Sequence, residues 1–352
     1  MTDAQDDPLP PTTLPASTQL SLMNFADNAD FIKRFSDEMS FALIDCGRFL
    51  DLERLAGITV GYDFDAALAA VDLGFESTRA LEYTNNGDVV CVAKALNVLR
   101  DGRVMSHVVY NANFIEAMLD PTDANHMQAL HIVAHELGHV AELKWRDEAM
   151  PDFILRHRYD NWVSGMLVEA AMVIWEEYAA CRQTALIGNK EELKQTYAET
   201  FDKSASNSLS RTYEKIKAYR THAQLDQLLV EAGEPLAMPL KLAGYLLGHL
   251  DGIEDESDLL ILCPSYSKTH LAVIIPQIHQ ALRSLWETRT TWQGVEVFDD
   301  LVQLVIQTYE AGGIELIDQG SQFYVDVPFS AQTMPNGEAD MLMIRLEKMF
   351  KR

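Results

Sequence analysis

The stretch that decides how this chain is interpreted is residues 130–140, which read LHIVAHELGHV. It contains the pattern HExxH, formed by His135, Glu136 and His139. Residues four apart lie on the same face of an α-helix, so the two imidazoles can bind one metal ion. Glu136 is turned by about 100° from His135, which directs its carboxylate towards a metal-bound water rather than towards the metal. The pattern therefore predicts a metal centre with two histidine ligands and an adjacent general base.

The residues around this pattern predict that it lies on a helix with a buried side. Asp120-Pro121 suits a helix start, with Asp as N-cap and Pro as the first helical residue, and the helix is expected to reach about residue 145. Gly138 lowers helix propensity by about 1 kcal/mol relative to Ala, which fits a helix that packs closely on a neighbour. An apolar stripe on the back of the helix is formed by Leu130, Val133, Leu137 and Val140.

A zinc ion held by two histidines needs a further protein ligand, because catalytic zinc sites combine three protein ligands with one water. A third histidine in the longer pattern HExxHxxGxxH is excluded, since Glu142 and Trp145 occupy the Gly and His positions of that pattern. We therefore expect the third ligand to be a carboxylate on a second helix.

The second helix is expected over residues 162–186, and it offers Glu169, Glu176 and Glu177. At about 100° per residue, Glu177 lies at the edge of an apolar stripe, whereas Glu176 and Glu169 lie on the opposite face. A buried carboxylate needs a strong partner, which a metal ion provides. We predict Glu177 as the third zinc ligand. The alternative is an ion pair between Glu177 and a cation such as Arg182.

Upstream of the HExxH helix, the sequence predicts a small antiparallel β-meander. Asn86-Gly87 and Asp101-Gly102 are dipeptides that supply the positive φ angles of tight hairpin turns. They separate three candidate strands at residues 81–84, 89–99 and 104–110. In the last strand one face is expected to carry Val104, Ser106, Val108 and Tyr110, and the other Met105, His107 and Val109.

Most of the remaining chain has helical spacing of its apolar residues. Before the meander, helices are expected within residues 25–50 and 63–72, with a strand at 58–62 between them. Later helices are expected at about 190–232, 235–251, 268–288, 297–311 and 338–350, with a hairpin that joins 314–317 to 323–327.

These elements predict an α+β fold. A small antiparallel β-meander would pack on the helices that carry HExxH and the downstream Glu, and a mainly helical C-terminal region would follow. The length of 352 residues fits two domains. We expect a disordered tail at residues 1–20, a metal-site domain at 21–190 and a mainly helical C-terminal domain at 191–352.

Composition and charge exclude several kinds of partner. There are 53 acidic and 28 basic residues, which gives a net charge of −25. Such a chain repels nucleic-acid backbones and anionic lipid, so neither nucleic acid nor membrane is an expected partner. The four cysteines are far apart in sequence, which argues against a disulfide framework and favours a reducing compartment. The N-terminus lacks the pattern of a signal peptide and no long apolar run occurs, so a cytoplasmic protein is expected.

The HExxH pattern followed by Glu177 on a second helix resembles the gluzincin arrangement. Residues 177–181 read EYAAC, which is similar to the gluzincin signature ExxA followed by Asp or Asn. The order of helix, small sheet and HExxH helix over residues 25–190 most resembles the ImmA/IrrE-type soluble minimal metallopeptidases. The resemblance implies a zinc metallopeptidase that hydrolyses peptide bonds of a protein or peptide substrate. His135, His139 and Glu177 would bind Zn²⁺, and Glu136 would activate the water.

This chain departs from that signature at Cys181, where the family has the Asp or Asn that often orients the first histidine. Glu142, on the same helix face as the two histidines, is a candidate substitute. A solvated Glu near the helix end is the alternative for Glu142. His131, one turn before His135, either lines the cleft or has a structural role.

The resemblance also implies a strand that pairs with an extended substrate, for which residues 104–110 are the candidate. A donor that stabilises the tetrahedral oxyanion is expected as well. The candidate donors are His157, Arg158, Tyr159, Tyr178 and Arg182. Two other functions fit the same residues: a zinc-stabilised regulatory or protein-binding module with little hydrolytic activity, and a zinc hydrolase that acts on non-peptide substrates.

Overall fold

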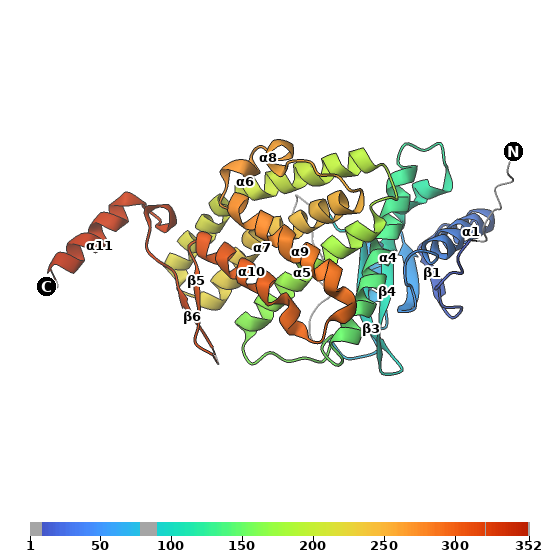
Figure 1. The fold of residues 1–352 in the computed structure, drawn as a ribbon, viewed down its shortest axis with the longest axis horizontal. Helices are drawn as coiled ribbons and strands as arrows, with labels where there is room; N and C mark the ends of the chain where they lie inside the picture. Colours follow the sequence, from blue (N-terminus) through green and yellow to red (C-terminus); the bar gives the residue numbers. More distant parts are fainter. Residues whose placement is uncertain (1–8, 78–89, 321, 351–352) are drawn as a thin grey trace. The chain divides into compact units, whose positions relative to one another are not determined.

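The computed structural model describes residues 9–77, 90–320 and 322–350. In this part of the chain, helices combine with two small sheets (Figure 1), so the predicted α+β class is confirmed. None of the described helices has both the length and the apolar character that crossing a bilayer requires.

Contacts between residues divide the chain into two compact units. Unit 1 comprises Met1–His157, Ala179–Leu193 and Asp251–Glu254, and unit 2 comprises Arg158–Tyr178, Lys194–Leu250 and Asp255–Arg352. The division follows contacts rather than chain order. The domain boundary that the sequence pattern indicates near residue 190 stays a prediction.

Unit 1 is built around a four-stranded sheet with the strand order β1-β2-β4-β3. Its strands are β1 (Gln19–Met23), β2 (Leu55–Gly61), β3 (Ala93–Arg100) and β4 (Arg103–Asn111). Only β3 and β4 are antiparallel, whereas β1 pairs with β2 and β2 with β4 in parallel. The expectation of a purely antiparallel meander is therefore corrected to a mixed sheet. A helix connects β1 to β2, and connections of that kind join parallel strands.

The hairpin between β3 and β4 confirms one sequence prediction. Asp101 and Gly102 have φ angles of +50° and +79°, as a tight two-residue hairpin turn requires. The strands predicted at 89–99 and 104–110 correspond to β3 and β4. The predicted strand at 81–84 and the turn at Asn86-Gly87 lie outside the described residues.

Helices cover both faces of this sheet. On one face α1 (Ala29–Cys46) and α4 (His126–Ala149) enclose a core that includes Val108 and Tyr110 of β4. On the other face α2 (Phe64–Ala69) packs in a smaller cluster that includes Val109. The alternation predicted for this strand is therefore confirmed, and the Tyr110 side of the sheet is the side that faces the HExxH helix.

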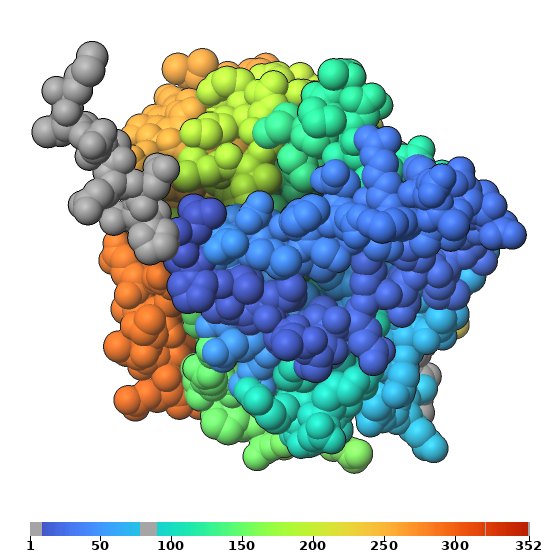
Figure 2. Space-filling view, turned by 90° about the vertical axis from the view of Figure 1, so that its right-hand side faces the viewer, coloured from blue at the N-terminus to red at the C-terminus, as the bar shows by residue number. Residues whose placement is uncertain are grey.

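The N-terminal segment is partly ordered, unlike the disordered tail expected for residues 1–20. Residues 19 and 20 belong to β1. The Thr13 hydroxyl lies 2.9 Å from the Gly47 carbonyl oxygen and 2.7 Å from that of Leu50, and it accepts a hydrogen bond from the Leu52 amide. Residues 9–23 thus fold along α1 and β2. In Figure 2 the residues of this segment and of α1, in blue, are at the surface of the face shown.

The HExxH helix starts later than expected. Its first residue is His126 rather than Pro121. The Asp120 carboxylate accepts hydrogen bonds from the amide and the hydroxyl of Thr122, and these bonds hold the segment before the helix in a turn. The helix continues to Ala149, past the predicted end near residue 145.

The remaining elements are mostly helical. After β4 come α3 (Ala112–Ile115) and a 3₁₀ turn, η1 (Glu116–Leu119). After α4 the order is α5 (Trp162–Thr184), α6 (Lys190–His222), α7 (Leu225–Gly252), α8 (Leu259–Leu262), η2 (Tyr266–Lys268), α9 (Leu271–Thr288), η3 (Arg289–Thr291), η4 (Val295–Phe298), α10 (Asp299–Ala311), β5 (Glu315–Asp318), β6 (Phe323–Asp326), η5 (Ala331–Thr333) and α11 (Glu338–Phe350).

One helix break was predicted in the wrong place. The sequence suggested a break between 232 and 235, but α7 runs through Pro235 and Pro239. The chain instead turns at Ala223, whose φ of +55° ends α6. The helical segments predicted near 268–288, 297–311 and 338–350 and the hairpin of β5 with β6 are all present.

Candidate metal centre

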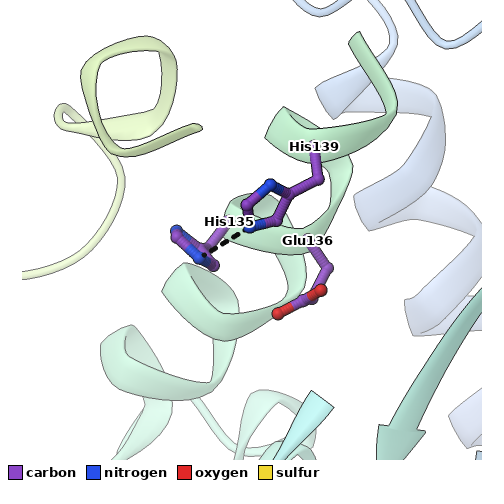
Figure 3. A group of neighbouring side chains, drawn as sticks. All are labelled: His135, Glu136 and His139. Carbon is purple, nitrogen blue, oxygen red and sulfur yellow. Dashed lines mark hydrogen bonds between the residues drawn. The ribbon is translucent and has the colours of Figure 1, made fainter. Parts of the chain in front are cut away.

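The two histidines of HExxH converge on one point beside α4. Their Nε2 atoms are 3.2 Å apart, and the ring planes are nearly perpendicular at 88° (Figure 3). Two nitrogen ligands at the usual Zn–N distance on a tetrahedral zinc ion are separated by about 3.3 Å. The spacing in this chain therefore fits a pair of ligands on one zinc ion. Together with Glu136 they form a group whose ligand atoms all lie within 4.8 Å of one another.

Glu136 is held at the sheet rather than on the histidine side of the helix. Its Oε2 accepts a hydrogen bond of 2.8 Å from the Ala95 amide of β3, and the residue is buried. Figure 3 shows its carboxylate to one side of the imidazole pair. The carboxylate groups with the two imidazoles, as the sequence predicted, and its role as a general base stays a prediction.

Tyr110 lies beneath this part of α4. Its hydroxyl donates a hydrogen bond of 2.9 Å to the Val133 carbonyl oxygen. Burial raises the pKa of Tyr110 well above its ordinary value, and the nearby Glu136 carboxylate adds to the increase. The phenol is therefore a neutral donor that links β4 to the turn of helix before His135.

In unit 1 the last part of α5 packs unusually close to α4. A Cβ atom placed on Gly138 would lie 3.0 Å from the Cα of Ala180. The Gln183 side-chain amide donates to the Gly138 carbonyl oxygen at 3.3 Å. The close approach predicted from Gly138 is therefore confirmed, and only small residues fit at the crossing.

This crossing brings Cys181 to the first histidine. The Cys181 Sγ lies 3.6 Å from the Nδ1 of His135, and both residues are buried. Glu142, the candidate substitute for the missing Asp or Asn, is fully buried, and its Oε1 accepts a hydrogen bond of 2.6 Å from Arg146 Nε. The alternative of a solvated Glu at the helix end is therefore wrong.

For His131 the sequence allowed either a cleft-lining or a structural role, and its contacts support the structural one. Its Nδ1 is 2.9 Å from the Ile187 carbonyl oxygen, just beyond the end of α5. The residue is buried. This contact fastens the chain after α5 to the helix turn before His135.

Glu177 has the burial that helix phase predicts. It is 6% exposed, whereas Glu176 is half-buried and Glu169 is exposed. Its role as third zinc ligand stays a prediction. In unit 2 its Oε1 is 3.1 Å from the Lys241 Nζ. Arg182, the cation that the ion-pair alternative named, lies 3.5 Å from Asp251 in unit 1, and its pairing with Glu177 stays a prediction.

Lys241 is a residue beside Glu177 that sequence reasoning missed. It lies on α7, three residues before Gly244, which is one of the α7 glycines that contact α5. A Cβ on Gly244 would be 2.7 Å from the Ile174 carbonyl oxygen, and one on Gly248 would be 2.3 Å from that of Tyr178. Gly244 and Gly248 are four residues apart, a spacing that could have pointed to close helix packing and hence to Lys241.

The contacts of the five candidate oxyanion donors differ from residue to residue, and the contacts described below do not identify one of them as the donor. His157 stacks on Phe153, and Tyr178 packs with Trp175 and Trp286 in unit 2. Burial, and then the Glu169 carboxylate, raise the pKa of Tyr159 to about 12. The identity of the oxyanion donor stays a prediction.

The strand proposed to pair with a substrate is not at the sheet edge. Residues 104–110 belong to β4, which is hydrogen-bonded to β2 on one side and to β3 on the other. The prediction is therefore wrong, because both sides of this strand are already paired. The outer strand next to β4 is β3, the strand whose Ala95 amide binds Glu136.

Comparison with models of protein families, with curated proteins and with solved structures finds no match to this chain. The assignment of a function therefore depends on the geometry of the site.

Proposed function

We propose that the chain is a zinc metallopeptidase of the gluzincin type. The observation that carries the proposal is the 3.2 Å separation of the His135 and His139 Nε2 atoms on one helix, with the Glu136 carboxylate in the same group. Two imidazoles on successive turns form the helical part of a zinc-binding HExxH site. Imidazole nitrogens are also ligands that zinc prefers.

The third ligand in this proposal is Glu177. It lies four residues before Cys181 on the continuous helix α5, and residues four apart share a helix face. Cys181 contacts His135, so the face of α5 that carries Glu177 is the face that carries this contact. The burial of Glu177 adds support, because a buried carboxylate needs a cationic partner.

A bound zinc ion would supply a lowered pKa for a water molecule and would polarise the substrate carbonyl. The residues of the chain would do the rest. Glu136 would take the proton from the water and later pass it to the leaving amine. The Ala95 amide would hold the carboxylate during both transfers, because it donates to Oε2 and leaves the second oxygen for the proton. The substrate class is a protein or peptide.

One observation favours a second function. The Lys241 ammonium already pairs with Glu177, so this buried carboxylate has a cationic partner without a metal ion. A folded module that binds a partner protein, with Glu177 in a structural role, fits that contact. Such a module would retain the histidine pair as a stabilising metal site.

The test begins with the metal content of protein purified without chelator, for which we expect close to one zinc ion per chain. A proteomic cleavage screen against the extract of the source cells then compares the wild-type chain with Glu136→Gln. Cleavage by the wild type alone supports the peptidase. Zinc binding without any cleavage supports the binding module, and failure to bind zinc after loading overturns both metal-based functions.

A further inference from the structure

We propose that Cys181 is the positioning residue of His135, holding the imidazole by an Nδ1–H···S hydrogen bond so that Nε2 is presented to the metal. The inference rests on the proposed function in one respect, namely that His135 is a metal ligand. It goes beyond that function, because it assigns to a thiol a role that carboxylates, carbonyl groups or water usually have in metal sites.

The two nitrogens of His135 have different neighbours. Nε2 faces the Nε2 of His139 at 3.2 Å, and Nδ1 faces the Cys181 Sγ at 3.6 Å. An imidazole that binds zinc through Nε2 carries its proton on Nδ1 and needs an acceptor there. The sulfur of a thiol is a weak acceptor, and its distance to Nδ1 is within the usual range for contacts to sulfur.

The position of the sulfur is set by helix packing rather than by a flexible side chain. Cys181 follows Ala180, which lies against Gly138 at the closest point of the α4–α5 crossing. The Gln183 amide donates to the Gly138 carbonyl oxygen at that point, and His131 contacts Ile187 just beyond the end of α5. The thiol is fully buried, so water does not compete for Nδ1 through an exposed surface.

Burial alone does not explain a cysteine at this position. A small apolar residue would satisfy the packing beside Gly138 and Ala180, but it would leave the Nδ1–H of a zinc-bound His135 without this acceptor. The sulfur therefore has a function for the ring that its volume does not supply.

The experiment compares zinc affinity, measured by competition with a chelator, in the full-length wild type, Cys181→Ala, Cys181→Ser and Cys46→Ala. Loss of an outer partner of a ligand histidine usually weakens metal binding about 10- to 100-fold, so Cys181→Ala is expected to fall in that range. Cys181→Ser should stay within about threefold of the wild type, because a hydroxyl accepts the same hydrogen bond. Cys46 is a buried thiol of the α1 core, so Cys46→Ala should lose stability but keep its zinc affinity.

A second readout does not require metal. Long-range ¹H–¹⁵N spectra of the metal-free protein report which nitrogen of His135 carries the proton. We expect the Nδ1 resonance to shift in Cys181→Ala and to return towards the wild-type position in Cys181→Ser. If the wild type binds no zinc, the proposed function fails while these spectra still test the hydrogen bond. Wild-type zinc affinity in Cys181→Ala, or an unchanged His135 spectrum, would overturn the inference.

Discussion

The helix α5 crosses α4 in unit 1 and α7 in unit 2, and at both crossings a glycine lies against the backbone of the other helix. The side chains that surround the two crossings differ. In unit 1 its final turns meet α4 through Gly138 and Ala180, and the groups buried there include an imidazole and a thiol. In unit 2 its earlier turns meet α7 through Gly244 and Gly248, among aromatic side chains such as Trp175. Close packing by itself therefore does not identify a functional site. The two crossings differ in the kind of polar group that they bring together, namely two imidazoles and a thiol at α4 and an ion pair at α7.

The two crossings also differ in how their buried polar groups are compensated. Near α7 the ion pair of Lys241 with Glu177 joins opposite charges. Near α4 the buried Glu142 carboxylate pairs with Arg146 on the same helix, and the Glu136 carboxylate accepts a hydrogen bond from the Ala95 amide.

The change with the greatest predicted consequence is at Glu177, which pairs with Lys241 at the α7 crossing and is the proposed third zinc ligand. Under the proposed function, Glu177→Ala weakens zinc binding by orders of magnitude and abolishes activity. It also lowers the free energy of unfolding by about 3 kcal/mol, because Lys241 loses its buried partner. Chelator competition and urea denaturation measure the two effects separately.

The matched control for this change is Glu176→Ala. Glu176 is adjacent in sequence and half-buried, and its replacement should change stability by no more than about 0.5 kcal/mol. A Glu177→Ala variant that is destabilised but binds zinc like the wild type would show that Glu177 serves the ion pair with Lys241 and is not a zinc ligand.

The next prediction is a loss of hydrolysis on replacement of Glu136 in unit 1. Glu136→Gln preserves shape but cannot accept a proton, so it should keep its zinc and lose hydrolysis by at least about a hundredfold. Steady-state rates with a substrate from the cleavage screen, alongside elemental analysis, measure both. Full activity in a zinc-loaded variant would remove Glu136 from the mechanism.

Replacement of Gly248 or Gly138 by alanine tests how tightly the helices pack at each crossing. In Gly248→Ala the new Cβ would lie 2.3 Å from a backbone oxygen, so a shift of the helix is needed and should cost about 1–3 kcal/mol. In Gly138→Ala the nearest atom is 3.0 Å away, so the strain is smaller. Both changes gain about 1 kcal/mol in helix propensity, which offsets much of the strain in Gly138→Ala and less of it in Gly248→Ala. Thermal unfolding should therefore separate the two, with Gly248→Ala less stable. The reverse order would show that the α4 crossing is the more rigid one.

The smallest effect concerns pH. Burial, with a smaller contribution from Arg100, lowers the pKa of His107 to about 4, and its Nε2 is 2.9 Å from the Thr59 hydroxyl. Because the folded pKa is below the unfolded one, the unfolded chain binds the proton first. Stability contributed by this residue is therefore present above about pH 6.5 and is lost as the pH falls towards 4. Urea denaturation at pH 7 and pH 5 should show a smaller loss in His107→Gln than in the wild type. Equal losses would exclude His107 as the source.

The parts of the fold that could be predicted are those decided by neighbours in sequence. Helix periodicity predicted the burial of Glu177 and the approach of His135 to His139. The local φ preferences of Asp101-Gly102 predicted the hairpin turn. Each of these depends on a few consecutive residues, where backbone geometry dominates.

The parts that could not be predicted depend on contacts far apart in the chain. The parallel pairing of β1 with β2 requires α1 to cross the sheet, which no property of either strand encodes. Lys241 meets Glu177 only because glycines on α7 allow the helices to approach. The unexpected course of α7 through Pro235 likewise shows tertiary packing overriding a local helix breaker.

The helix α5 is uninterrupted from Trp162 to Thr184, and a helix of this kind behaves as a stiff rod with a rise of about 1.5 Å per residue. A slide of its final turns by one residue along α4 would move Ala180 off Gly138 and carry the Cys181 sulfur away from His135. The axial position of these turns therefore sets both the packing at the crossing and the alignment of the imidazole.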